Sequence, residues 1–146
     1  MTVERLPGSV LFACTMNAVR SPMAECIARS LLPGSTFIAS AGLHAGEPDP
    51  FVEAVLADAG LTLGERHPRT IDDLEDLYFD LIVTLAPEAH HAALELTRTL
   101  AVDVEYWPTA DPTSARGSRE HILAAYRDVR DRLKARIEAR FGPKTA

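Results

Sequence analysis

A cysteine and an arginine separated by five residues, Cys14 and Arg20, stand in the segment LFACTMNAVRSPMAE at positions 11–25. The cysteine ends an apolar run, and the pair Ser21-Pro22 after the arginine is typical of a helix N-terminus. A short loop between a strand and a helix can turn its backbone N–H groups inward and form an anion-binding nest. The same positive potential favours a thiolate, and a guanidinium can grip two oxygens of a tetrahedral oxyanion. The spacing therefore predicts a nucleophile at the floor of an oxyanion cradle.

The residues between this cysteine and the helix are expected to form the cradle. Ser21 can give the thiolate a hydroxyl hydrogen bond while it caps a helix that we expect to start at Pro22. Asn17 tolerates left-handed backbone angles better than most residues, which a tight loop without glycine needs. The residues predicted to bind phosphate are Thr15, Met16, Asn17, Ala18, Val19, Arg20 and Ser21.

A cysteine that attacks phosphorus needs an acid on the opposite side to protonate the leaving oxygen. The segment WPTADP at positions 107–112 offers Asp111, and the following Pro112 keeps this aspartate extended rather than helical. Asp-Pro is also a common way to start a turn, so a purely structural role is the alternative.

The chain alternates strand and helix signals. Nearly continuous apolar runs predict buried strands at 8–14 and 80–86, and shorter signals predict strands at 35–42 and 101–107. Helices are expected from Pro22, from Asp49-Pro50, after Thr70, from Pro87 and from near Ser118. This alternation predicts an α/β fold, a three-layer sandwich in which helices cover both faces of a four-stranded parallel sheet. Because the first and third strands look central, the expected strand order is 2-1-3-4, which puts the loop after the first strand at the switch point.

Composition limits the classes of function. The 146 residues fit one domain, 1–146, with 47% hydrophobic and 25% charged residues. A net charge of −6 argues against nucleic acid as a partner. No run has membrane-spanning length, no leader pattern is present, and no Cys/His spacing suggests a metal or another cofactor. We therefore expect a cytoplasmic protein with two reduced cysteines.

The motif Cys-x5-Arg-Ser-Pro-Met-Ala-Glu is followed in order by ASAG, GERHPRTI, FDLIVTLAPE and WPTADP. Together these segments resemble the low-molecular-weight protein-tyrosine phosphatase family, including its arsenate-reductase-like relatives, over essentially the whole chain. The resemblance implies hydrolysis of aryl phosphate or phosphotyrosine monoesters through a cysteinyl-phosphate, with phosphorylated substrates and inorganic phosphate as partners. It assigns Cys14 as nucleophile, Arg20 as phosphate clamp, Ser21 as thiolate stabiliser and Asp111 as general acid. It further suggests a supporting hydrogen-bond network made by Asn17, Ser40 and His67.

Three positions depart from the family's usual pattern. Met16 replaces a glycine, and if that position requires a positive φ the substitution costs about 1 kcal/mol or more. Val19 replaces a frequent second cysteine, which removes the protection of an intraloop disulfide. Thr113 replaces an aromatic residue that walls the cleft for a phosphotyrosine ring.

Two other functions compete with the phosphatase. An arsenate reductase would need further thiols, and Cys26 lies too far along its helix for an easy disulfide with Cys14. We expect Cys26 to be a small buried residue, so that a reductase would borrow an external thiol. The second alternative is a non-catalytic phosphate-binding module, which would need neither the thiol nor Asp111.

Overall fold

Four parallel strands form one sheet in the computed structural model, which describes residues 6–64 and 66–142. The central strands are β1 (Ser9–Cys14) and β3 (Leu81–Thr84), and the edge strands are β2 (Phe37–Gly42) and β4 (Asp103–Tyr106). The order is β2-β1-β3-β4, and each neighbouring pair is parallel. The predicted strand order and parallel sheet are confirmed.

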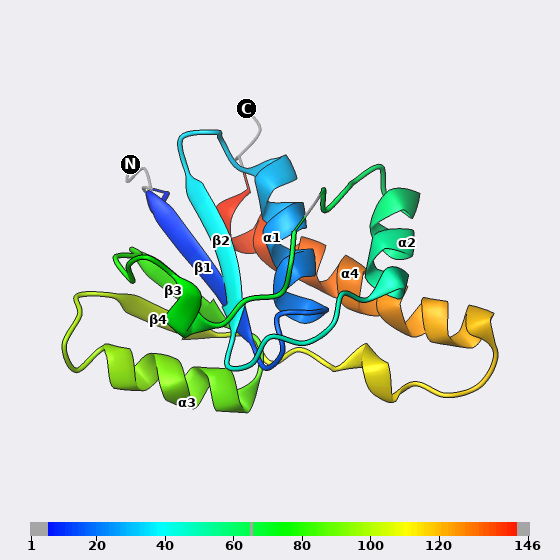
Figure 1. Ribbon diagram of the computed structural model, residues 1–146. Helices are drawn as coiled ribbons and strands as arrows, with labels where there is room; N and C mark the ends of the chain where they lie inside the picture. The colour runs from blue at the N-terminus through cyan, green and yellow to red at the C-terminus, as the bar shows by residue number, and fades with distance from the viewer. Residues whose placement is uncertain (1–5, 65, 143–146) are drawn as a thin grey trace.

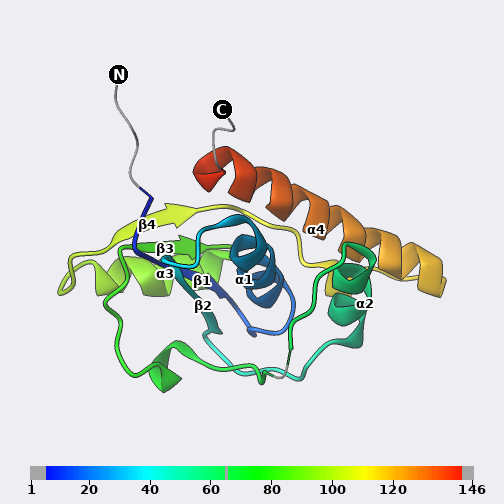
Figure 2. The same ribbon diagram turned by 90° about the horizontal axis from the view of Figure 1, so that it is seen from above.

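Helices cover both faces of this sheet, as predicted (Figure 1). Helices α1 (Arg20–Leu31) and α4 (Arg119–Phe141) pack on one face, and α2 (Pro50–Asp58) packs against α4. Helix α3 (Pro87–Leu96) lies against the other face, and Figure 2 shows α4 running beside α1 and α2. The short 3₁₀ helices are η1 (Ile71–Asp73) and η2 (Pro112–Ser114). Within the two described ranges, no helix combines the length and apolar character needed to cross a bilayer.

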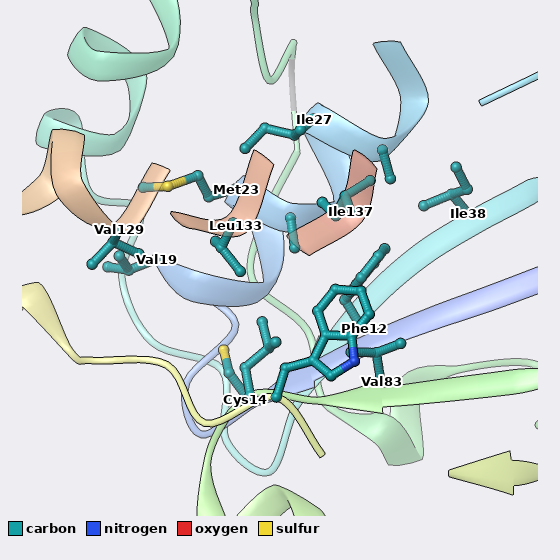
Figure 3. Close-up of a cluster of buried hydrophobic side chains, with 14 of the residues drawn as sticks. Phe12, Cys14, Val19, Met23, Ile27, Ile38, Val83, Val129, Leu133 and Ile137 are labelled. Atoms are coloured by element: carbon teal, nitrogen blue, oxygen red, sulfur yellow. The ribbon is translucent and has the colours of Figure 1, made fainter. Parts of the chain in front are cut away.

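The larger core lies between the sheet and helices α1 and α4 (Figure 3). Phe12 from β1 and Met23 from α1 are fully buried there, together with Ile137 from α4. A second core, rich in alanine, joins the opposite face to α3. Strand β1 is therefore covered on both faces, and this packing fixes its carboxyl end, where Cys14 is 2% exposed.

Most helices start at the predicted N-cap residues. The Asp49 carboxylate accepts from the N–H of Phe51 at 2.9 Å, and the Ser118 hydroxyl accepts from the N–H of His121 at 3.1 Å. The prediction that Ser21 caps α1 is wrong. Helix α1 already begins at Arg20, and its N-cap residue, Val19, has no side-chain capping hydrogen bond. The Ser21 hydroxyl bonds elsewhere, to Cys14 and Asn17.

Candidate active site

The loop between β1 and α1, residues 15–19, lies at the carboxyl edge of the sheet beside the end of β2. The carbonyl oxygens of Thr15 and Met16 accept hydrogen bonds from the N–H groups of His44 and Gly46, each at 2.9 Å. In contrast, the amides of residues 16–19 donate to no other group in the described part of the chain. The carbonyl groups of Thr15 and Met16 are thus hydrogen-bonded, whereas the amides of residues 16–19 remain free beside the start of α1. Free amides next to a helix N-terminus are the arrangement of an anion nest.

A cleft of about 520 Å³ opens over this loop. Its lining includes Cys14, Arg20 and Asp111, which the sequence predicted for one site. The other lining residues are Thr15, Met16, Ala18, Val19, Gly46, Glu47, Asp49, Pro87, Glu88 and Thr113. The cleft therefore draws on the segments that follow all four strands, including the start of α3, and Cys14, Arg20 and Asp111 all line it.

Cys14 and Ser21 are in direct contact at the floor of the cleft. The Sγ atom of Cys14 lies 2.9 Å from the Oγ atom of Ser21, and both side chains are buried. Asn17 donates to the same Ser21 oxygen at 2.9 Å, whereas the carbonyl of Ala41 is 3.5 Å away. The Ser21 hydroxyl can donate to the sulfur or to the Ala41 carbonyl, and the sulfur is the nearer partner.

Arg20, the first residue of α1, reaches across the cleft. Its Nη1 atom donates to the carbonyl of Thr109 at 3.1 Å, and its Nη2 atom lies 4.0 Å from Oδ2 of Asp111. The side chain is only 12% exposed. The guanidinium is therefore held at the mouth, with donors left over for an oxyanion.

Asp111 has the structural role that was the alternative for it, and it also lines the cleft. Its Oδ1 atom accepts from the N–H of Thr113 at 3.0 Å and from the hydroxyl of Thr113 at 2.7 Å, which caps η2. Its Oδ2 atom faces Arg20, and the side chain is half exposed. One carboxylate oxygen thus holds the turn, while the other faces Arg20 in the cleft.

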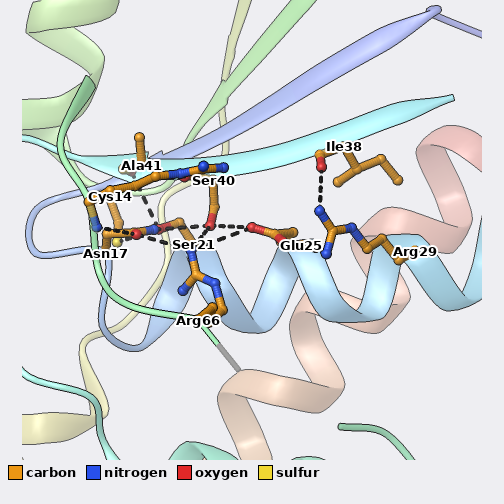
Figure 4. Close-up of polar contacts among 10 residues, drawn as sticks. Cys14, Asn17, Ser21, Glu25, Arg29, Ile38, Ser40, Ala41 and Arg66 are labelled. Atoms are coloured by element: carbon orange, nitrogen blue, oxygen red, sulfur yellow. Dashed lines mark hydrogen bonds and ion pairs between the residues drawn. The ribbon is translucent and has the colours of Figure 1, made fainter. Parts of the chain in front are cut away.

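Asn17 is the hub of the supporting network and has a left-handed backbone, with φ at 51° and no exposed surface. Its amide group donates to Ser21 and, at 3.0 Å, to Ser40. Its Oδ1 atom accepts from Nη2 of Arg66 at 3.1 Å and from the N–H of Arg69 at 2.9 Å. All four hydrogen-bonding positions of the side chain are therefore used, as Figure 4 shows for most of these partners.

The structure differs from the expectation at His67. In the described part of the chain His67 forms no hydrogen bond to Asn17 or Ser40, and it lines a separate hollow with Arg29 and Arg66. Arg66 takes the expected place because its longer side chain reaches both partners. Sequence reasoning also missed Glu25, which is 4% exposed and accepts from the Ser40 hydroxyl at 2.5 Å. Glu25 is the final residue of the motif Cys-x5-Arg-Ser-Pro-Met-Ala-Glu, and this position was the sequence signal that could have identified it.

The three unusual positions fall at the wall of the cleft. The backbone of Met16 is not strained, because Asn17 is the only non-glycine residue with positive φ in the described ranges. Met16 is 44% exposed, and its side chain lies against Gly46. Val19 is buried in the larger core. Thr113 lines the cleft and orients Asp111.

Cys26 stands apart from the cleft. Its thiol donates to the carbonyl of Thr62 at 3.4 Å, and the residue is half-buried rather than buried as expected. Burial raises the pKa of the Cys26 thiol, and the neighbouring carboxylate of Glu25 raises it further. Position and protonation both separate Cys26 from chemistry at Cys14.

Fold and site together define an α/β protein with a cysteine-based oxyanion loop at the switch point of its sheet. The sequence profile of the low-molecular-weight phosphotyrosine protein phosphatase family matches residues 9–142, and the chain belongs to that family. An arsenate reductase of Bacillus licheniformis is 32% identical over 131 residues, covering 89% of this chain and 92% of the relative. Another arsenate reductase, from Halalkalibacterium halodurans, is 31% identical over 129 residues, with 88% and 91% covered.

Solved structures show the same fold. The tyrosine phosphatase AmsI of Erwinia amylovora superposes with a TM-score of 0.74 at 23% identity, covering 91% of this chain and 90% of that one. An arsenate reductase in a phosphate-binding state gives a TM-score of 0.70 at 25% identity, with 90% and 94% covered. Both phosphatases and reductases therefore share this architecture.

Proposed function

We propose that this protein is a cysteine-dependent phosphatase that hydrolyses aryl phosphate or phosphotyrosine monoesters. The observation that carries the proposal is the 2.9 Å contact between Cys14 Sγ and Ser21 Oγ at the floor of a cleft that also holds Arg20 and Asp111. A thiol, an anion nest, a guanidinium and a free carboxylate oxygen within one cleft are the groups that phosphoryl transfer to sulfur requires.

In the first step, the Cys14 thiolate attacks phosphorus and the bond between phosphorus and the ester oxygen breaks. The free amides of the loop and the guanidinium of Arg20 hold the three non-bridging oxygens. Asp111 gives its proton to the departing oxygen from the opposite side. The products of this step are an alcohol or phenol and a cysteinyl-phosphate.

In the second step, water attacks the cysteinyl-phosphate and the sulfur leaves as a thiolate. Asp111, now ionised, accepts the proton of that water, which restores its starting form. The Ser21 hydroxyl donates to the departing sulfur and stabilises it. Inorganic phosphate is released, and no cofactor enters either step.

Arsenate reduction is the second candidate, and the names of the relatives at 31–32% identity favour it over hydrolysis. The same cleft would bind arsenate, a tetrahedral oxyanion, and Cys14 would displace water to form a thiol–arsenate adduct. An external thiol must then attack the Cys14 sulfur, releasing arsenite and leaving a mixed disulfide that a second thiol reduces. These two thiols supply the two electrons, because the other cysteine of the chain, Cys26, lies outside the cleft.

A pair of assays on one preparation separates the candidates. We expect turnover of para-nitrophenyl phosphate in buffer with chelator, and no arsenite formation from arsenate with glutathione, with or without a glutaredoxin or thioredoxin system. Cys14→Ser should abolish turnover, and the matched Cys26→Ser variant should retain it. Arsenite formation without phosphatase turnover would establish the reductase, and phosphate binding with neither activity would establish the non-catalytic binding module.

A further inference from the structure

Arg66 is a charged side chain that the catalytic steps do not use, yet it is mostly buried behind the loop. One atom, Nη2, lies 3.1 Å from Oδ1 of Asn17, 3.0 Å from Oγ of Ser40 and 3.6 Å from Oε1 of Glu25. The side chain is 17% exposed, and Figure 4 places it beside the chain of polar groups that ends at Cys14. A long side chain held at so many points is a fixed part of the site.

The charges around Arg66 leave a positive excess behind the loop. Buried Glu25 is compensated twice, because Nη1 of Arg29 lies 2.8 Å from its Oε2 atom and Arg66 lies beside Oε1. The guanidinium of Arg69 adds a further cation, whose Nε atom donates to the carbonyl of Ser40. Three guanidinium groups thus surround one carboxylate next to the anion nest.

The donors and acceptors around Ser40 and Asn17 are fixed by their partners. The single hydroxyl hydrogen of Ser40 goes to Glu25, so the Ser40 oxygen can only accept from Asn17 and Arg66. Arg66 and the N–H of residue 69 both donate to Oδ1 of Asn17, which fixes the orientation of that amide group. Its Nδ2 atom must then donate to Ser21. The Ser21 hydrogen can be directed at the Cys14 sulfur at 2.9 Å, which is closer than the Ala41 carbonyl at 3.5 Å.

We propose that Arg66 is a positioning residue that sets the direction of this hydrogen-bond chain and supplies a permanent positive charge to the Cys14 thiolate. The family resemblance had suggested His67 for the supporting network, and histidine as a residue type commonly changes its charge between pH 5 and 8. A guanidinium keeps its charge throughout the working range of proteins. The residue that supports the loop therefore keeps its charge as the pH changes, and the loop keeps its anion-binding form.

The charge environment agrees with this role. Burial lowers the pKa of Arg66, the carboxylate of Glu25 raises it, and the neighbouring Arg69 and Arg29 lower it. Because a nearby cation favours a thiolate, removal of Arg66 should disfavour the thiolate form of Cys14. This inference rests on the proposed function only in taking Cys14 as the reactive group.

The test measures Cys14 without turnover. In a Cys26→Ser background, we expect Arg66→Met to slow alkylation of Cys14 by iodoacetamide at pH 7 by about 3- to 10-fold, the effect of removing one unit charge near a partly buried site. The midpoint of the alkylation profile should move to higher pH, and inorganic phosphate should bind more weakly. Arg66→Lys should restore part of the alkylation rate, because the charge returns without the fixed fork. The adjacent His67→Ala is the matched control and should change neither measurement.

Circular dichroism and thermal unfolding establish which variants fold. If Arg66→Met does not fold, Arg66→Lys is used for the test. Its phosphate affinity should then be lower than that of the wild type, because lysine lacks the planar fork. Alkylation unchanged in a folded Arg66→Met, or altered equally by His67→Ala, overturns the proposal. A shifted alkylation profile in a protein that lacks phosphatase turnover would instead refute the proposed function and leave the role of Arg66 standing.

Discussion

Arg20 and Asp111 face each other across the mouth of the cleft, with Nη2 of the arginine 4.0 Å from Oδ2 of the aspartate. At this separation, and with Asp111 half exposed, the pair is a weak one that contributes little to stability. An arriving oxyanion can therefore take over the guanidinium without breaking a strong contact.

Replacement of Arg20 by lysine should be far from conservative. A point charge cannot reproduce a planar fork on two phosphate oxygens, so we expect turnover of para-nitrophenyl phosphate to fall by about 10²-fold or more. The thermal unfolding temperature should change little. Arg132→Lys, on the exposed side of α4 where it pairs with Asp128 at 2.8 Å, is the matched control. A near-normal rate in Arg20→Lys would show that Arg20 does not contact the phosphoryl group.

Gly42 permits the close approach of β2 to the loop. A Cβ atom at this position would lie 2.7 Å from the backbone N of Asn17 and 2.9 Å from the carbonyl of Thr15. Because both obstacles are backbone atoms, Gly42→Ala should displace the loop, destabilise the protein by about 1–3 kcal/mol and weaken phosphate binding. Gly34→Ala, where no atom lies within 4 Å, should leave both properties intact. Unchanged phosphate affinity in Gly42→Ala would mean that the loop tolerates displacement.

The fold followed from the sequence because its signals are local. Apolar runs marked the buried strands, and Asp49 and Ser118 marked helix starts that the structure confirms. The supporting network did not follow, because His67 and Arg66 belong to an irregular segment where spacing does not determine which side chain reaches inward. The Ser21-Pro22 pair also misled, since a buried serine beside a thiol can bond to tertiary partners instead of capping its helix.

Tyr126 ties α4 to the wall of the cleft and should make stability fall at high pH. Its hydroxyl donates to Oδ2 of Asp49 at 2.7 Å. Burial and this hydrogen bond raise the pKa of Tyr126 far above its usual range. A raised pKa means that the stabilisation is fully present below the ordinary tyrosine value of about 10 and is lost as pH rises beyond it. The free energies of unfolding of wild type and Tyr126→Phe, measured with denaturant, should differ by about 1–3 kcal/mol at pH 7. This difference should shrink above pH ~10. A difference that does not change with pH would contradict this.

The mouth of the cleft should select against aryl phosphates that carry a second anionic group. Four carboxylates line it, from Glu47, Asp49, Glu88 and Asp111, against the single guanidinium of Arg20. At low salt we expect a higher kcat/KM for an aryl phosphate carrying a trimethylammonium group than for its carboxylate analogue. This gap between the two kcat/KM values should narrow near 1 M salt, where the Debye length is about 3 Å. Glu88→Gln should reduce the gap, whereas Glu95→Gln, in an exposed pair with Arg98, should not. Equal preference for the two substrates at low salt would rule out this selectivity.

Asp111→Asn separates a catalyst from a phosphate binder. Asparagine can still cap η2, so the turn held by Oδ1 should survive while the exchangeable proton is lost. We expect turnover to fall by about 10²–10⁴-fold for substrates with basic leaving oxygens. The loss should be smallest for nitrophenolate, which departs readily without a proton, and the decline of turnover toward neutral pH should flatten. Phosphate affinity should barely change, because the proposed mechanism assigns Asp111 to the leaving side. An equal loss for every leaving group would make Asp111 a structural turn residue, and the acid would then have to come from another carboxylate of the cleft.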